Sequence, residues 1–192
     1  METKETERRR FLTSATLLLA LSGAAATSVP FIESWQPSAR ARVAGSPVTV
    51  KIDKLEAGRM ITVKWQRKPV FILRRTKANL KTLTDSRHLK ELRDPDSRVD
   101  HQPDYARNKY RSIRPDVFVA VGICTHLGCV PEYVPRGDSN GGEALYFCPC
   151  HGSKYDLAGR VYKNVPAPTN LVVPPYHYSG NETLVIGQSK AA

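Results

Sequence analysis

The sequence predicts a mainly β protein in which a single N-terminal transmembrane helix precedes a β-rich head of antiparallel sheets. The helix is predicted by residues 11–32, an uncharged stretch of about 22 residues. At about 1.5 Å per residue, such a helix crosses a hydrocarbon layer of roughly 30 Å. The head is predicted from residue 48 onward, where VTVKID alternates and MITVKWQRKPVFILRRT holds two short apolar runs divided by QRKP, a pattern typical of a hairpin.

The uncharged stretch follows three arginines at positions 8–10, which assign residues 1–10 to the cytoplasmic side of a membrane. Followed by Phe-Leu, these arginines resemble a twin-arginine export signal, with Glu7 where Ser or Thr is usual. A cleavable signal peptide is the alternative, because alanines at 24–26 offer small residues for cleavage. The stretch is longer than the about 7–15 residues of a signal-peptide core, which favours a retained anchor.

A flexible hinge is predicted over 33–47, where Pro, Gly and Ser interrupt any apolar period, and the head is expected over 48–192. Polar residues after the hairpin predict helix over about 77–93. DVFVAVGI and EALYFC predict strands that lead into Cys124 and Cys148. TNLVVPPYHYSGNETLVIG predicts two further strands around a Ser-Gly-Asn turn.

The net charge of +11 indicates no nucleic-acid partner. The N-terminal ten residues contribute little of the charge, and the remaining excess is spread over 40–115 without forming one basic helix. An anionic membrane surface or an acidic partner explains such a charge equally well.

All four cysteines and two of the five histidines lie in CTHLGCV at 124–130 and CPCHGSKYD at 148–156. Three interpretations compete: a zinc site of two Cys and two His, two disulfides, or a 2Fe–2S cluster whose spare cysteine pair forms one disulfide. Zinc leaves GSKYD without a purpose, and two disulfides leave the histidines without one. The cluster interpretation uses all six residues.

At these motifs the chain resembles the Rieske iron–sulfur proteins of ubiquinol–cytochrome c reductase. CTHLGC and CPCHGS carry the resemblance, which extends to the arginine-led anchor, to TVKWQRKPVFILRRT and to VPAPTNLVVPPY at 165–176. The related oxygenase domains lack the second cysteine pair, so its presence argues against that branch. The resemblance implies a small cluster-binding subdomain at about 120–170 within the head.

The resemblance also implies a role for each motif residue. One iron would be bound by Cys124 and Cys148, the other by His126 and His151, and a disulfide would join Cys129 to Cys150. Hydrogen bonds that tune the cluster would come from Ser153 and Tyr155. A face that docks on cytochrome b would include Leu127, Gly128, Pro166, Ala167 and Pro168. Here Val165 stands where the family usually has glycine before Pro-Ala-Pro, which leaves the rigid lid but alters its fit.

Histidine ligands suit a cluster that oxidises a quinol. Two ferric ions, two sulfides and two thiolates are neutral together with neutral imidazoles, whereas four thiolates leave a negative charge that opposes an incoming electron. Histidine ligation thus raises the potential to about −150 to +300 mV. The imidazoles also gain proton affinity with the electron, so proton and electron can leave the quinol together.

The resemblance therefore implies the iron–sulfur subunit of a bacterial ubiquinol–cytochrome c reductase, with the N-terminus cytoplasmic and the head periplasmic at the inner membrane. The head would take one electron from ubiquinol at cytochrome b, with His151 the first choice for the quinol hydrogen bond, and reduce a cytochrome c-type haem. Quinol oxidation would thereby contribute to the proton gradient. The alternatives are an electron-transfer subunit of another membrane or periplasmic oxidoreductase and a zinc-stabilised binding module.

Overall fold

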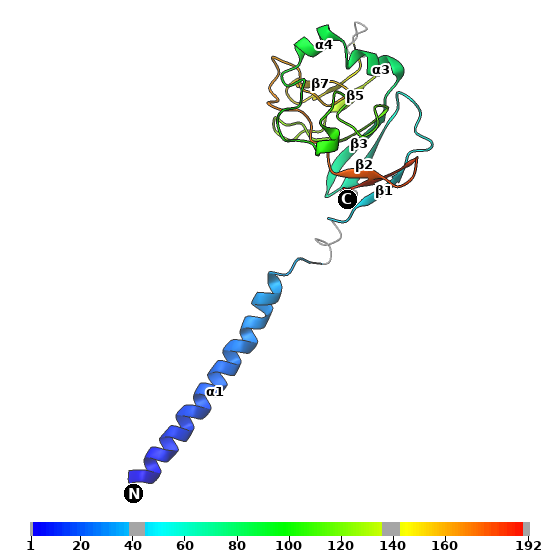
Figure 1. Ribbon diagram of the computed structural model, residues 1–192. Helices are drawn as coiled ribbons and strands as arrows, with labels where there is room; N and C mark the ends of the chain where they lie inside the picture. Colours follow the sequence, from blue (N-terminus) through cyan, green and yellow to red (C-terminus); the bar gives the residue numbers. More distant parts are fainter. Residues whose placement is uncertain (1, 39–44, 136–142, 190–192) are drawn as a thin grey trace. The chain divides into compact units, whose positions relative to one another are not determined.

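The computed structural model describes residues 2–38, 45–135 and 143–189 (Figure 1). The chain divides into two compact units, Met1–Val43 and Ala44–Ala192. Part of the hinge expected from the sequence, residues 39–44, lies outside the described residues.

The first unit is one long helix, α1 (Glu2–Ser34), of 33 residues. It is long and apolar enough to cross a membrane. Its hydroxyl side chains bond back to the helix itself: Thr13, Thr16 and Ser22 each donate to the carbonyl oxygen four residues earlier, at 2.6–2.8 Å. Such bonds satisfy polar groups that would otherwise face hydrocarbon. The expected helix is therefore present and extends beyond 11–32 in both directions.

The described part of the head holds three antiparallel sheets of three strands each. The first sheet, in the order β1-β9-β8, contains β1 (Val48–Lys51), β9 (Thr183–Ile186) and β8 (Tyr176–Tyr178). The second contains β2 (Met60–Trp65), β3 (Lys68–Arg74) and β4 (Val117–Val121). The third contains β5 (Glu132–Val134), β6 (Leu145–Phe147) and β7 (Lys154–Tyr155). The predicted mainly β class is confirmed.

The predicted hairpin is β2–β3, in which Trp65 pairs with Lys68 across a two-residue turn. The turn residues Gln66 and Arg67 have φ of 49° and 64°, as expected for the tight turn whose twist matches that of the strands. Every residue of β4, on the other side of β3, is buried. It is the strand predicted from DVFVAVGI.

Two short helices replace the single helix predicted over about 77–93. They are α3 (Lys77–Thr82) and α4 (Ser86–Glu91), and they lie at the end of the head opposite β1 (Figure 1). The interruption has a local cause, because the Asp85 side chain accepts from the backbone N–H of Arg87 and starts a second helix. A single turn of 3-10 helix, η1 (Asp104–Ala106), follows.

The two strands predicted around the Ser-Gly-Asn turn are β8 and β9. The apolar run of residues 171–173, in which Leu171 and Val173 are buried and Val172 is exposed, lies outside β8. Two prolines, Pro174 and Pro175, follow it and have no N–H for a ladder. The backbone N–H groups of Leu171 and Val173 instead donate to carbonyl oxygens of loops, those of Gly159 and His101. Regular pairing resumes only at β8.

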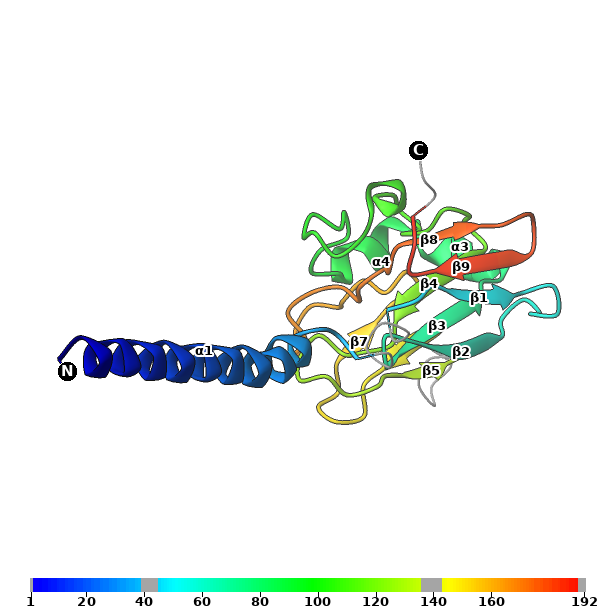
Figure 2. The ribbon, with the colours of Figure 1, turned by 90° about the horizontal axis from the view of Figure 1, so that it is seen from below.

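Aromatic packing joins the second and third sheets. The ring of Tyr146, on β6, lies 5.7 Å from that of Phe71 and 6.3 Å from that of Phe118, measured between centroids. Figure 2 shows β5 and β7 on the side of β3 away from β8 and β9. The third sheet falls within 120–170, the range expected for the cluster-binding subdomain. This core holds in place the two loops that carry the cysteine–histidine motifs.

Candidate metal centre

Two loops with the same backbone pattern carry the motifs. The first follows β4, and the second joins β6 to β7. In the first, Cys124 donates its N–H to the carbonyl oxygen five residues later and accepts at its own carbonyl from Gly128. In the second, Cys148 donates five residues forward and accepts from Gly152. The two glycines have φ of 87° and 75°, where a side chain would be strained, so both turns require glycine.

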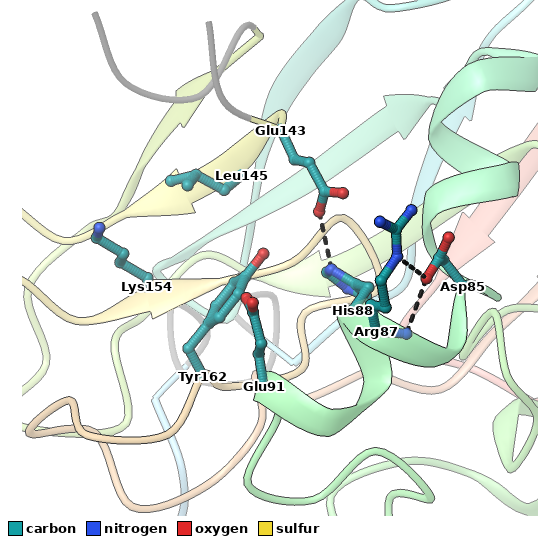
Figure 3. A pocket seen from close by; sticks show the side chains of 8 residues that line it. All are labelled: Asp85, Arg87, His88, Glu91, Glu143, Leu145, Lys154 and Tyr162. Carbon is teal, nitrogen blue, oxygen red and sulfur yellow. Dashed lines mark hydrogen bonds and ion pairs between the residues drawn. The ribbon is translucent and has the colours of Figure 1, made fainter. Parts of the chain in front are cut away.

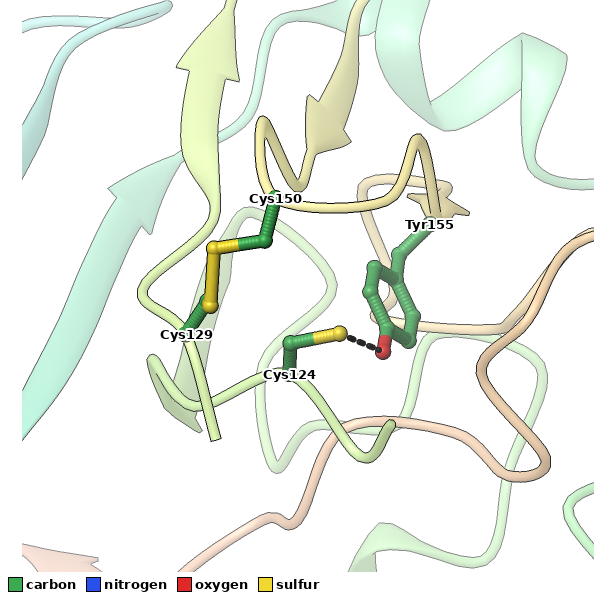
Figure 4. The surroundings of a disulfide bond; sticks show 4 residues. All are labelled: Cys124, Cys129, Cys150 and Tyr155. Carbon is green, nitrogen blue, oxygen red and sulfur yellow. Dashed lines mark hydrogen bonds between the residues drawn. A yellow bond between two sulfur atoms is a disulfide. The ribbon is translucent and has the colours of Figure 1, made fainter. Parts of the chain in front are cut away.

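A disulfide joins the loops. Cys129 and Cys150 are bonded, with their Cα atoms 6.6 Å apart (Figure 4). This is the pairing that the family resemblance implied. Cys124 and Cys148 are free and buried, so the structure does not form the second bridge of the two-disulfide interpretation. The Cys148 sulfur lies within 4.8 Å of both disulfide sulfurs. Because disulfide sulfurs are not thiolates, Cys148 is the only one of these three cysteines that can bind a metal.

The two free thiols differ in their electrostatic surroundings. Burial opposes ionisation of Cys124, yet hydrogen bonds from Tyr155 and from the backbone of His126 outweigh it and lower the pKa of the thiol. Burial raises the pKa of Cys148, and the neighbouring Cys124 sulfur adds to the rise. Two adjacent thiols oppose each other's ionisation. A metal cation bound to both sulfurs would remove this opposition and stabilise both as thiolates.

The two motif histidines meet at the outer end of the loops. The ring centroids of His126 and His151 lie 4.8 Å apart with the rings nearly perpendicular. His126 is half-buried and His151 is exposed. Two thiols and two imidazoles thus come from two loops that a disulfide holds together. This donor set fits both a 2Fe–2S cluster of mixed ligation and zinc.

Tyr155 approaches the site from β7. Its hydroxyl oxygen lies 3.2 Å from Sγ of Cys124 (Figure 4) and donates to that sulfur when it is a thiolate. The backbone N–H of Thr125 donates to the same hydroxyl at 3.0 Å. Thr125 also donates its own hydroxyl proton to the carbonyl oxygen of Thr169 at 2.7 Å. Its oxygen, 3.1 Å from the Tyr155 hydroxyl, can therefore only accept, and it competes with the Cys124 sulfur for the Tyr155 proton. Thr125 lies inside the sequence motif, but sequence reasoning gave it no role.

Ser153 connects the second loop to the proline segment. Its hydroxyl oxygen, fully buried, accepts from the backbone N–H of Ala167 at 3.1 Å. The accepted bond occupies a lone pair and leaves the hydroxyl proton available to another acceptor. Ala167 is buried, whereas Pro166 and Pro168 are exposed. The segment expected to cover the site is thus tied to it by this bond.

The tip around the histidines is apolar and open to solvent. Leu127 is 72% exposed and Val130 is 51% exposed, and Gly128 is exposed beside them. All thirteen residues singled out from the sequence belong to the two loops, to β7 or to the proline segment.

The fold and donor set define the class of protein, a small β domain whose cysteines and histidines, on two linked loops, can hold a metal centre. The family model of the "Rieske [2Fe-2S] domain" matches residues 46–177. A second model, described as "Ubiquitinol-cytochrome C reductase Fe-S subunit TAT signal", matches residues 1–38. These matches favour an iron–sulfur cluster over zinc and agree with the export signal predicted from the arginines.

Similar proteins show to which family within this class the chain belongs. The ubiquinol-cytochrome c reductase iron-sulfur subunit of Allochromatium vinosum is 48% identical, over 96% of this chain and 90% of its own length. The subunit of the same name from Blastochloris viridis is 40% identical, over 99% of this chain and 98% of its own. The solved structure "Hyperthermophilic respiratory Complex III" contains a chain 26% identical with a TM-score of 0.51, covering 88% of this chain and 96% of that one. The chain belongs to the Rieske iron–sulfur subunits of ubiquinol–cytochrome c reductase.

Proposed function

We propose that Cys124 and Cys148 bind one iron of a 2Fe–2S cluster and that His126 and His151 bind the other. The observation that carries this proposal is the convergence of two buried free thiols and two neighbouring imidazoles from loops joined by a disulfide. When bound, such a group accepts and passes on one electron at a potential of about −150 to +300 mV.

The exposed histidine is our choice for contact with the substrate, ubiquinol. His151 is exposed, whereas His126 is half-buried, so the ring nitrogen of His151 that would not bind iron would be open to a quinol hydroxyl. A quinol hydroxyl that bonds to this nitrogen can lose its proton there as its electron leaves. The chain holds no haem motif, so quinol oxidation belongs to a complex of which this chain is one part.

The apolar tip is the proposed docking face for cytochrome b. Leu127 is the more exposed of the two large apolar side chains at the tip, Leu127 and Val130, and the exposed prolines 166 and 168 stand beside the buried Ala167. Docking there would exclude water from His151, which strengthens its hydrogen bond to the quinol. The head would then carry the electron to a cytochrome c-type haem, moving on the hinge at 33–47.

The N-terminal helix is the proposed anchor in a bacterial inner membrane. Its length and composition suffice to span a bilayer, and the arginines at 8–10 favour a cytoplasmic N-terminus. The head would then be periplasmic. The match of residues 1–38 to an export-signal model supports this orientation.

Electron paramagnetic resonance of the reduced membrane complex tests the ligand set. We expect hyperfine coupling to two histidine nitrogens that changes when the protein is prepared with ¹⁵N-histidine. The variant His177→Gln, at a half-buried residue whose Nδ1 lies 3.0 Å from the carbonyl oxygen of Gln188, is the control and should leave the coupling unchanged. A paramagnetic cluster without histidine coupling would contradict the ligand set, and zinc without a paramagnetic signal would contradict the cluster.

The tuning role of Ser153 and Tyr155 gives a prediction for the reduction potential. Ser153→Ala and Tyr155→Phe each remove a donor that favours the more negative, reduced state. Hydrogen bonds to charged acceptors are worth about 1.5–3 kcal/mol, and about 1.4 kcal/mol of difference between redox states equals about 59 mV. We expect each variant to retain its cluster and to show a potential lower by tens of millivolts in a spectroelectrochemical titration.

Tyr162→Phe is the matched control for these two variants. Its ring packs against His88, which is not part of the metal centre, so the potential should not change. If both tuning variants also keep the potential of the unmodified protein, then Ser153 and Tyr155 serve only packing and the Ala167 contact.

A further inference from the structure

A buried histidine outside the metal centre bridges two carboxylates. His88, on α4, has a side chain that is 3% exposed. Its Nδ1 lies 2.8 Å from a carboxylate oxygen of Glu143, and its Nε2 lies 3.1 Å from one of Asp156. The three residues come from separate parts of the head: the helix, the start of the segment leading into β6, and the turn after β7 (Figure 3 shows His88 and Glu143).

This arrangement requires a doubly protonated ring. A carboxylate offers only acceptors, and a neutral imidazole carries one N–H and one bare lone pair. A neutral ring would place that lone pair against a carboxylate oxygen at about 3 Å, which is repulsive. Both contacts can be hydrogen bonds only when His88 is an imidazolium. The ring is then a cation shared by Glu143 and Asp156.

The two contacts differ in how firmly each carboxylate is held elsewhere. Asp156 is 1% exposed and also accepts from the Arg160 side chain at 2.7 Å and from two backbone N–H groups. The Glu143 side chain is 50% exposed. Among the residues that the structure describes, His88 is its only hydrogen-bond partner. When His88 loses one proton, the hydrogen bond to Glu143 is therefore broken and the one to Asp156 is kept.

The charges around His88 favour the imidazolium. Burial opposes its charge, but the hydrogen bond to Asp156 and the charges of Asp156 and Glu143 outweigh burial and the repulsion of Arg160, and they raise the pKa of His88. An open cavity of about 560 Å³ adjoins the ring (Figure 3). The cavity lies between α4, the strands β6 and β7, and the segment around Tyr162. It is lined by Asp85, Arg87, His88, Glu91, Glu143, Leu145, Lys154 and Tyr162.

We propose that His88 is a pH-sensitive latch that fastens the segment entering β6 to α4 while it is protonated and releases Glu143 when it loses its Nδ1 proton to solvent. The neutral ring keeps its Nε2–H and continues to donate to Asp156. Water reaches the freed atoms through the cavity. The residues of the latch lie outside the metal centre, and the inference does not rest on the proposed function.

The segment that contains Glu143 leads through β6 into the second cysteine loop. Glu143 is two residues before β6 (Leu145–Phe147), and β6 ends one residue before Cys148. The latch therefore controls how firmly the second cysteine loop is supported at its entry. Because the folded pKa is raised above the ordinary 6.5, the support is complete below about pH 6.5 and is lost as the pH rises through the folded value.

Hydrogen exchange followed by mass spectrometry tests the latch on the full-length, cluster-loaded protein in detergent. Labelling would be done at about pH 6, 8 and 10, with times scaled for the base-catalysed intrinsic rate. In the unmodified protein we expect amides of residues 143–148 to exchange about fivefold faster at the highest pH after this correction, as for loss of one partly exposed ion pair. Peptides of β2–β3 should show no such change.

Glu143→Gln is the decisive variant, because it alters a half-exposed side chain and leaves the Asp156 contact intact. A glutamine amide donates to a neutral Nδ1 and accepts from a protonated one, so the corrected exchange rates should become independent of pH. His88→Gln should also abolish the pH dependence. The proposal is overturned if the unmodified protein shows no pH dependence in 143–148, or if the dependence persists in both variants.

Discussion

Cys129→Ser is expected to lower the free energy of unfolding of the head by about 3 kcal/mol. The disulfide to Cys150 spans 21 residues, and closing a loop of that size removes about this much conformational freedom from the unfolded chain. The two motif loops would then lose the covalent bond that holds them together. Urea denaturation, followed by circular dichroism and by cluster absorbance, measures the change.

The cluster should report the same loss. Without the bond the loops separate more easily, and the alignment of Tyr155 with Cys124 is no longer enforced. We expect poor cluster retention and, in the fraction that retains it, a lowered potential, because the hydrogen bonds that favour the reduced state are weakened. Iron analysis and a redox titration measure these two effects.

Cys150→Ser and the double variant make the test specific. If the bond itself is responsible, each single variant and the double variant should lose the same stability, because either substitution removes the whole interaction. Additive losses would mean that the two side chains act separately through packing. Full cluster content with an unchanged potential in Cys129→Ser would mean that the loops need no covalent link.

The cysteine–histidine motifs were predictable because each lies within a few residues of sequence. A tight loop closed by a glycine at positive φ brings Cys124 near His126, and the same geometry recurs at Cys148 and His151. Thr125 could have been assigned from its place inside the motif. Its bond to the Thr169 carbonyl depends on a segment 44 residues away, which only the folded chain brings close.

Elements were harder to predict where individual residues override the pattern of the surrounding segment. Polar composition over 77–93 suggested one helix, but Asp85 is a better N-cap than a helix interior residue and divides it. Residues 171–173 have the composition of a strand, yet the following prolines remove two ladder donors. The pairing of His88 with Asp156 joins residues 68 apart. No periodicity in the sequence indicates such a contact.

Asp156→Asn is expected to cost the head about 3–5 kcal/mol, the usual result of removing one partner from a buried ion pair. The Asp156 carboxylate is 1% exposed and lies 2.7 Å from Nε of Arg160, which is itself fully buried. Asparagine would leave the guanidinium without a counter-charge and would weaken the contact with His88. Because residue 156 follows Tyr155 directly, we also expect less cluster to be retained. Denaturation near pH 7 measures the loss, and Asp100→Asn, in an exposed pair with Arg107, should change little.

The pH dependence of this variant identifies charge as the cause. Burial alone would raise the pKa of Asp156, but the charge of Arg160 and the hydrogen bond from His88 outweigh it and lower the pKa to about 2 from the ordinary 3.8. A carboxylate with a lowered pKa stabilises the fold above its unfolded value, and this contribution is lost as the pH falls through about 2. The gap in stability between the unmodified protein and Asp156→Asn should therefore be full above about pH 4 and should narrow as the pH falls toward 2. A gap that stays constant over that range would show that the side chain acts through shape and neutral hydrogen bonds, because only a contribution from charge disappears on protonation.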